Sequence, residues 1–105
     1  MTAHPIEVFT VAELKTIVLI GDYLVRYGKR GFTYRGLRAY WDARKAYKVL
    51  EWHTVERIIR RFCRPPYDLL VRRRVKRGTV YYPTTTFWMT YEWLKSQLRS
   101  GGGKR

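Results

Sequence analysis

Acidic residues are scarce in this 105-residue chain, which has 8 Asp plus Glu against 22 Lys plus Arg and a net charge of +14. A compact domain of this size would repel itself at that charge, so we expect an anionic partner, with nucleic acid as the first candidate. The charge is unevenly placed: residues 1–25 carry one basic and three acidic residues, and residues 26–105 carry 21 basic and 5 acidic ones. The partner surface is therefore expected outside the first helix.

Cysteine, asparagine and glutamine are also scarce. Cys63 is the only cysteine, which excludes an intramolecular disulfide and favours a reducing interior. The chain has no Asn and one Gln, which is a hint of a thermophilic source. With only His4, His53 and Cys63 as soft ligands, we expect no metal site within one chain.

Long hydrophobic runs and catalytic motifs are missing. The most apolar stretch, Ile17 to Val25, contains Gly21 and Asp22 and is too short to span a bilayer. The N-terminus lacks the charged start and long apolar core of a secretory signal, so we expect a cytoplasmic protein. No glycine-rich phosphate loop, HExxH motif or CxxC pair occurs, and we expect neither enzymatic activity nor a cofactor.

The chain has enough apolar material to fold. Its hydrophobic fraction is 46% and its aromatic fraction 16%, which predicts one domain over residues 1–98. Residues 99–105 are expected to be a flexible basic tail.

Two helices are predicted in the first half of the chain. Thr10-Val11-Ala12-Glu13 is a capping box, and the helix that it starts should end at the segment from Gly28 to Gly31. Thr33 is expected to cap a second helix. One face of that helix contains Leu37, Tyr40, Trp41, Arg44 and Tyr47.

The third helix carries an arginine stripe. We expect Thr54 to cap it and Pro65-Pro66 to stop it. At 100° per residue, its apolar side contains Val55, Ile58, Ile59 and Phe62. The opposite side contains Arg57, Arg60, Arg61 and Arg64. A solvated helix face usually mixes charges of both signs, and the single sign here favours binding to a nucleic-acid groove.

A basic β-hairpin is predicted after the two prolines. Val71, Val75 and residues 80–82 favour strands, Arg77-Gly78 favours a tight reversal, and Pro83 ends the second strand. Its cationic residues are Arg72, Arg73, Arg74, Lys76 and Arg77.

A last helix is expected from about Thr86, with a stripe of Phe87, Tyr91, Leu94 and Leu98. Two helices offer surfaces for a homodimer. The candidate contacts are Leu19 and Ile20 on the first helix, and Met89 and Trp93 on the last.

This order of elements resembles a winged helix-turn-helix domain over residues 9–98. The resemblance rests on "FTYRGL" opening the second helix, "HTVERIIRRF" as the recognition helix and "LLVRRRVKRGTVYYP" as the wing. It implies an α+β, mainly helical fold with three N-terminal helices, a β-hairpin wing and a C-terminal helix. The connection "AYKVLEWHT" lacks the glycine usual in the turn of this family, so we expect a longer turn here.

The resemblance implies a double-stranded DNA-binding protein, a transcriptional regulator from an archaeon, a bacterium or one of their viruses or plasmids. The third helix would enter the major groove, with His53, Thr54, Arg57 and Arg61 at base edges and Arg60 and Arg64 nearer phosphates. The wing would lie on the backbone or in the minor groove through Arg72, Arg73, Arg74, Lys76 and Arg77. Arg35 and Arg38 of the second helix complete the candidate DNA contacts.

Other interpretations stay open from the sequence. An architectural or RNA- or ribosome-associated protein would suit the charge equally well, and an acidic protein partner is a third hypothesis. The hairpin arginines could also protect an edge strand from pairing. The aromatic residues could stack on unpaired bases, although their helical and strand spacing favours a place in the core.

Overall fold

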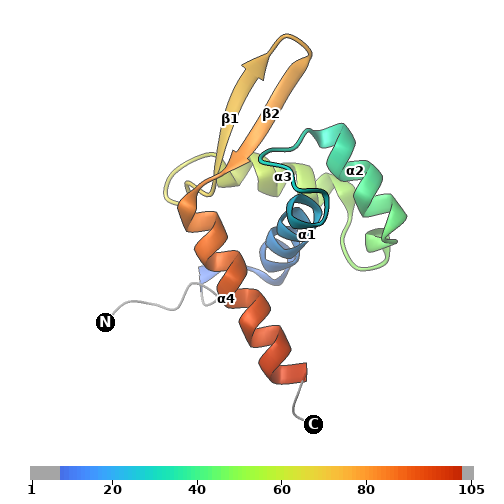
Figure 1. Ribbon diagram of the computed structural model, residues 1–105, viewed down its shortest axis with the longest axis vertical. Helices are drawn as coiled ribbons and strands as arrows, with labels where there is room; N and C mark the ends of the chain where they lie inside the picture. Colours follow the sequence, from blue (N-terminus) through green and yellow to red (C-terminus); the bar gives the residue numbers. More distant parts are fainter. Residues whose placement is uncertain (1–7, 103–105) are drawn as a thin grey trace.

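The computed structural model describes residues 8–102, with side chains described as far as Arg99. These residues form an α+β fold of helices and one antiparallel hairpin (Figure 1). The elements in chain order are α1 (Val11–Tyr27), α2 (Tyr34–Ala43), the 3₁₀ turn η2 (Ala46–Lys48), α3 (Trp52–Phe62), β1 (Leu70–Val75), β2 (Gly78–Pro83) and α4 (Thr85–Gly102). His4 and the last three residues of the predicted tail lie outside the described residues, and residues 99–102 are helical.

Helix α1 begins and ends as its sequence predicts. The Glu13 amide donates to Thr10 Oγ1 (3.1 Å), and the Thr10 amide donates to Glu13 Oε1 (2.9 Å), which completes the capping box. At the other end Gly28 adopts a left-handed conformation with φ of 60°, which closes the helix.

Helix α1 lies at the centre of the molecule, between α2, α3 and α4 (Figure 1). Leu19 and Ile20 are 8% and 0% exposed, so the prediction that they form a dimer surface is wrong. They point into the core because neighbouring helices cover α1 on more than one side. The approach to α4 is so close that a Cβ on Gly21 would collide with the ring of Tyr91.

Helix α2 is capped by Thr33, whose Oγ1 accepts from the Gly36 amide at 3.1 Å, as predicted. It ends at Ala43, so Tyr47 lies beyond it, in η2. We call residues 44–51, which link α2 to α3, the connector. In place of a glycine, Lys45 supplies the left-handed backbone of this turn with φ of 58°.

Helix α3 begins earlier than Thr54 predicts. Its first residue is Trp52, which is 6% exposed and packs against the rings of Tyr34 and Trp41. This packing sets the helix start, and Thr54 falls inside the first turn. The predicted apolar face is confirmed, because Val55, Ile58, Ile59 and Phe62 are all buried.

The predicted hairpin is present and projects away from the helices (Figure 1). Val75 pairs with Gly78, so the two-residue loop is Lys76-Arg77, one residue earlier than expected. Its base is fixed by the bridge between Tyr81 and Phe32, whose amides and carbonyls exchange hydrogen bonds of 2.8 and 2.9 Å. Helix α4 then packs Phe87, Tyr91 and Leu94 into the core, whereas Leu98 and Met89 remain exposed.

Candidate nucleic-acid interface

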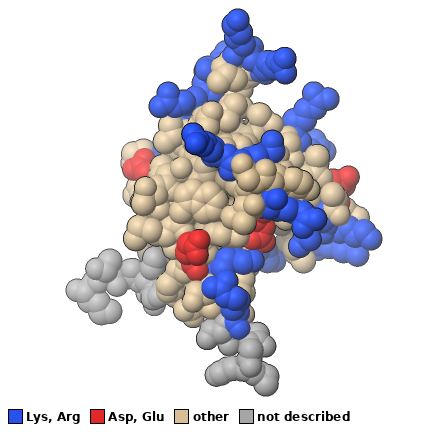
Figure 2. Space-filling model, in the orientation of Figure 1, with Lys and Arg blue, Asp and Glu red and all other residues tan. Residues whose placement is uncertain are grey.

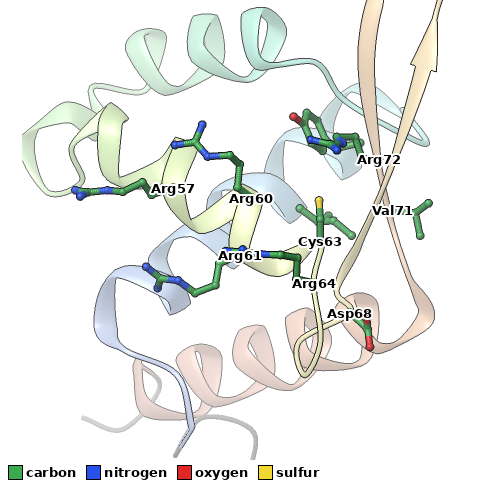
Figure 3. A pocket seen from close by; sticks show the side chains of 10 residues that line it. Arg57, Arg60, Arg61, Cys63, Arg64, Asp68, Val71 and Arg72 are labelled. Carbon is green, nitrogen blue, oxygen red and sulfur yellow. The ribbon is translucent and has the colours of Figure 1, made fainter.

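An open hollow of about 710 Å³ lies between α3 and the base of the hairpin. We call it the arginine hollow, because its lining includes Arg57, Arg60, Arg61, Arg64 and Arg72 (Figure 3). The arginine stripe of α3 therefore faces the first arginine of the hairpin. Its lining has five arginines and one carboxylate, Asp68. Further basic side chains cover the hairpin tip (Figure 2).

The cations of the hairpin divide between its two faces, because alternate residues of a strand point to opposite sides. Arg72 pairs with the buried Tyr81 and Arg74 pairs with Thr79, so both arginines lie on the face that continues from the arginine hollow. Arg73 pairs with Val80 on the opposite face, which Val71 shares. In Figure 3 the side chains of Val71 and Arg72 leave β1 on opposite sides. Lys76 and Arg77 form the loop at the tip.

Arg57, Arg60 and Arg64 are exposed, as the predicted site requires. Arg57 and Arg60 lie on α3, with Arg60 on the flank nearer α2, whereas Arg64 lies two residues beyond Phe62, where the helix ends before the predicted stop at Pro65-Pro66. Among the described residues, none of the three forms an ion pair with a carboxylate. Their charges are thus available to an external anion.

Arg61, predicted at base edges, forms an ion pair within the protein. Its Nη1 lies 2.7 Å from Glu13 Oε2, an atom that also accepts from the Tyr67 hydroxyl at 3.1 Å. Glu13 is 1% exposed, so this ion pair holds α3 against the start of α1. Arg61 is half-exposed, and its charge is already neutralised by a neighbour. The ion pair gives Arg61 a structural role, and its contact with base edges stays a prediction.

The environment of Glu13 favours its charged form. Burial alone would raise the pKa of this carboxyl, but the Thr10 amide, the Arg61 guanidinium and the Tyr67 hydroxyl more than offset that effect and lower the pKa below its ordinary value of 4.5. The sequence indicated Glu13 only as a capping residue. Its second role, as the ion-pair partner of Arg61, joins residues that are 48 positions apart, and a local sequence pattern does not show such a contact.

His53 and Thr54 lie in the first turn of α3. The His53 side chain is 84% exposed and its Nδ1 lies 3.9 Å from Glu56 Oε1. Thr54 is half-buried, because it lies on the same flank of the helix as Arg61. His53 is thus the more accessible of the two to a ligand.

Arg35 and Arg38 are not part of the arginine hollow. They line a separate hollow of about 540 Å³ between α2 and α3, where Asp42 and Glu56 balance their charge. The guanidinium carbon of Arg38 lies 5.9 Å from the centre of the Trp52 ring. The structure therefore places ten of the thirteen predicted residues on α3 and the hairpin, Arg64 in the loop just after α3, and these two on a neighbouring surface.

Five lining residues of the arginine hollow were not among the predicted site residues: Cys63, Asp68, Leu70, Val71 and Tyr81. Asp68 is the one carboxylate in its lining, and Cys63 lies beside the core edge. Burial raises the pKa of the Cys63 thiol, an effect opposed by the nearby charges of Arg72 and Arg64. In the sequence, only the closeness of residues 63–69 to the arginine stripe could have indicated Cys63 and Asp68.

Between residues 8 and 102 no helix combines the length and apolarity needed to cross a membrane. Over the same range no three His, Cys, Asp or Glu side chains gather in a way that could hold a metal ion. Comparison with known proteins gave no matching family model, no matching curated protein and no matching solved structure.

Proposed function

We propose that the protein binds double-stranded DNA as a winged helix-turn-helix domain, with α3 in the major groove and the hairpin on the adjoining backbone or minor groove. The observation that carries this proposal is the arginine hollow, where the free cations Arg57 and Arg60 of α3 and Arg64 just after it face Arg72 of the hairpin across an open concave surface. A transcriptional regulator is the role that this mode of binding supports best.

The dimensions of the hairpin suit that arrangement. Each strand has six residues, which at about 3.4 Å per residue places the tip roughly 17 Å from the base. The major groove of B-DNA is about 12 Å wide. With α3 in the groove, Lys76 and Arg77 at the tip would reach the bordering phosphates and the next minor groove.

The free charges suit a phosphate backbone. Eight basic residues between 57 and 77 lack an ion pair with a described carboxylate: Arg57, Arg60, Arg64, Arg72, Arg73, Arg74, Lys76 and Arg77. Each phosphate contact releases a counterion, so binding weakens as salt rises. If about five to seven of these residues meet phosphates, the log–log salt slope would be roughly −4 to −6.

Sequence preference would come from the first half of α3. Arg57 is exposed on the outer face of the helix, one turn beyond the exposed His53. A bidentate contact between arginine and guanine contributes about 1–3 kcal/mol of discrimination. Contacts from the hairpin tip to phosphates would fix orientation without reading sequence.

The test compares Arg57→Ala with Arg77→Ala in titrations of duplexes of varied sequence. Arg57→Ala should relax sequence preference. Arg77→Ala should weaken all duplexes alike and lower the salt slope by about one. Equal effects of the two variants would refute this division of roles. Structured RNA that competes better than any duplex would instead support the architectural or RNA-associated alternative.

A further inference from the structure

A second concave surface lies on another part of the molecule, between α1, the connector and the end of α4. Its volume is about 500 Å³, and its lining includes Leu14, Val18, Val49, Leu50, Leu94 and Leu98. We call it the apolar groove. None of its lining residues also lines the arginine hollow, so the two sites are separate.

The groove exposes large apolar side chains to water. Val49 is 64% exposed and Leu98 is 58% exposed, and they lie on two different walls of the groove. Exposed apolar residues scattered singly are ordinary, but apolar residues that converge on one concavity are typical of a ligand site. Covering them would remove apolar surface from water, which favours binding of an apolar group.

Three basic residues surround this apolar surface: Lys15 on α1, and Arg44 and Lys45 at the start of the connector. None of them forms an ion pair with a carboxylate among residues 8–102. Lys15 Nζ contacts only a neutral group, the carbonyl oxygen of Val49, at 3.3 Å. The rim thus carries positive charge that the protein itself does not neutralise.

The one acidic residue of the groove does not change this balance. Asp22 Oδ1 accepts from the Tyr91 hydroxyl at 2.6 Å and lies 3.2 Å from Lys95 Nζ. Its charge is therefore directed to α4 and is already paired. A ligand in the groove would meet an apolar floor and an excess of cations at the edge.

We propose that the apolar groove binds a small anionic amphiphile, a molecule with an apolar chain or ring and one terminal carboxylate. The chain would lie against Val18, Val49 and Leu98, and the carboxylate would meet Lys45 and Arg44 at the rim. The volume favours a small molecule, because sites for such ligands are commonly 300–1,000 Å³. A three-turn helix about 10 Å across and 16 Å long fills on the order of 1,000 Å³, about twice the volume of the groove.

Decanoate, used below its micelle concentration, is the probe for this site, with decanol and acetate as its controls. Decanol retains the apolar chain without the charge, and acetate retains the charge without the chain. Calorimetric titration of the full chain should give decanoate an affinity at least tenfold above that of either control. Methyl resonances of Leu14, Val18 and Leu98 should shift, whereas those of Val71 on the hairpin should not.

Two charge-reversal variants separate a built site from general attraction to a basic protein. Lys45→Glu places an acid at the rim, and Lys48→Glu makes the same charge change in the same connector at a residue outside the groove lining. Lys45→Glu should weaken decanoate binding at least fivefold, and Lys48→Glu less than twofold, with unchanged circular dichroism in both.

Three results would overturn the proposal. They are the absence of decanoate binding, equal affinity for decanoate and decanol, and equal weakening by the two charge reversals. Duplex binding is measured separately, so failure of this site would leave the proposal for α3 and the hairpin unaffected.

Discussion

Arg60 and Arg61 are neighbours in the chain with equal charge, yet the structure gives them different tasks. Arg60 is exposed on the stripe of α3, and Arg61 is tied to the buried Glu13 at 2.7 Å. We predict that Arg61→Ala lowers the stability of the fold and leaves the salt dependence of DNA binding nearly unchanged. Arg60→Ala should do the reverse.

The stability loss in Arg61→Ala depends on the hydrogen bonds that Glu13 retains. Losing one partner of a fully buried ion pair costs about 3–5 kcal/mol. Arg61 is 43% exposed, so water screens the pair, and Glu13 retains the Thr10 amide and the Tyr67 hydroxyl. A cost of about 2 kcal/mol is therefore expected. For a domain of this size it corresponds to a fall in Tm of about 8–16 °C.

Urea unfolding followed by circular dichroism measures the first effect, and fluorescence anisotropy with a labelled duplex at several salt concentrations measures the second. Arg60→Ala should reduce the log–log slope by about 0.9 with less than about 0.5 kcal/mol lost in stability. If Arg61→Ala reduced the slope as much as Arg60→Ala and left unfolding unchanged, the assignment of Arg61 to Glu13 would be refuted.

Three further predictions concern other parts of the fold. The fold lowers the pKa of Glu13, so the stability that Glu13 contributes is complete above its ordinary pKa of 4.5 and is lost as pH falls through the folded pKa. Glu13→Gln should therefore flatten the acid dependence of stability in urea titrations. Arg72→Ala should weaken duplex binding more than Arg73→Ala, because Arg72 faces the arginine hollow and Arg73 lies on the other face of the hairpin. A larger effect of Arg73→Ala in duplex titrations would contradict this division between the two faces. Gly21→Ala should cost about 1–3 kcal/mol in thermal unfolding, because its methyl group would collide with Tyr91, and a wild-type Tm would show that α1 and α4 are packed differently.

Local signals predicted the elements well where one interaction dominates. The capping box at Thr10, the cap at Thr33 and the end of α1 at the glycine segment depend on residues within four positions of each other, and each is confirmed. The start of α3 was misplaced because burial of Trp52 against Tyr34 and Trp41 outweighs the capping preference of Thr54. Tertiary packing decided that boundary.

The site was predictable as a set of cations but not as a geometry. The stripe on α3 follows from helical spacing, and the alternation of Arg72 and Arg73 would follow from any assigned strand. The tie from Arg61 to Glu13 and the buried place of Leu19 in the core depend on how α1 packs between its neighbours. Periodicity assigns residues to faces, and only the assembled fold shows what each face meets.

Selection of duplex fragments from genomic DNA, run at a low and a near-physiological salt concentration, tests the central proposal most directly. The proposed role predicts an enriched duplex motif at both salt concentrations, bound at least a thousandfold more tightly than bulk DNA at the higher one. It also predicts a log–log slope of roughly −4 to −6 on the selected duplex. Recovery of random fragments at both concentrations, with no shared motif, would contradict sequence-specific binding by α3.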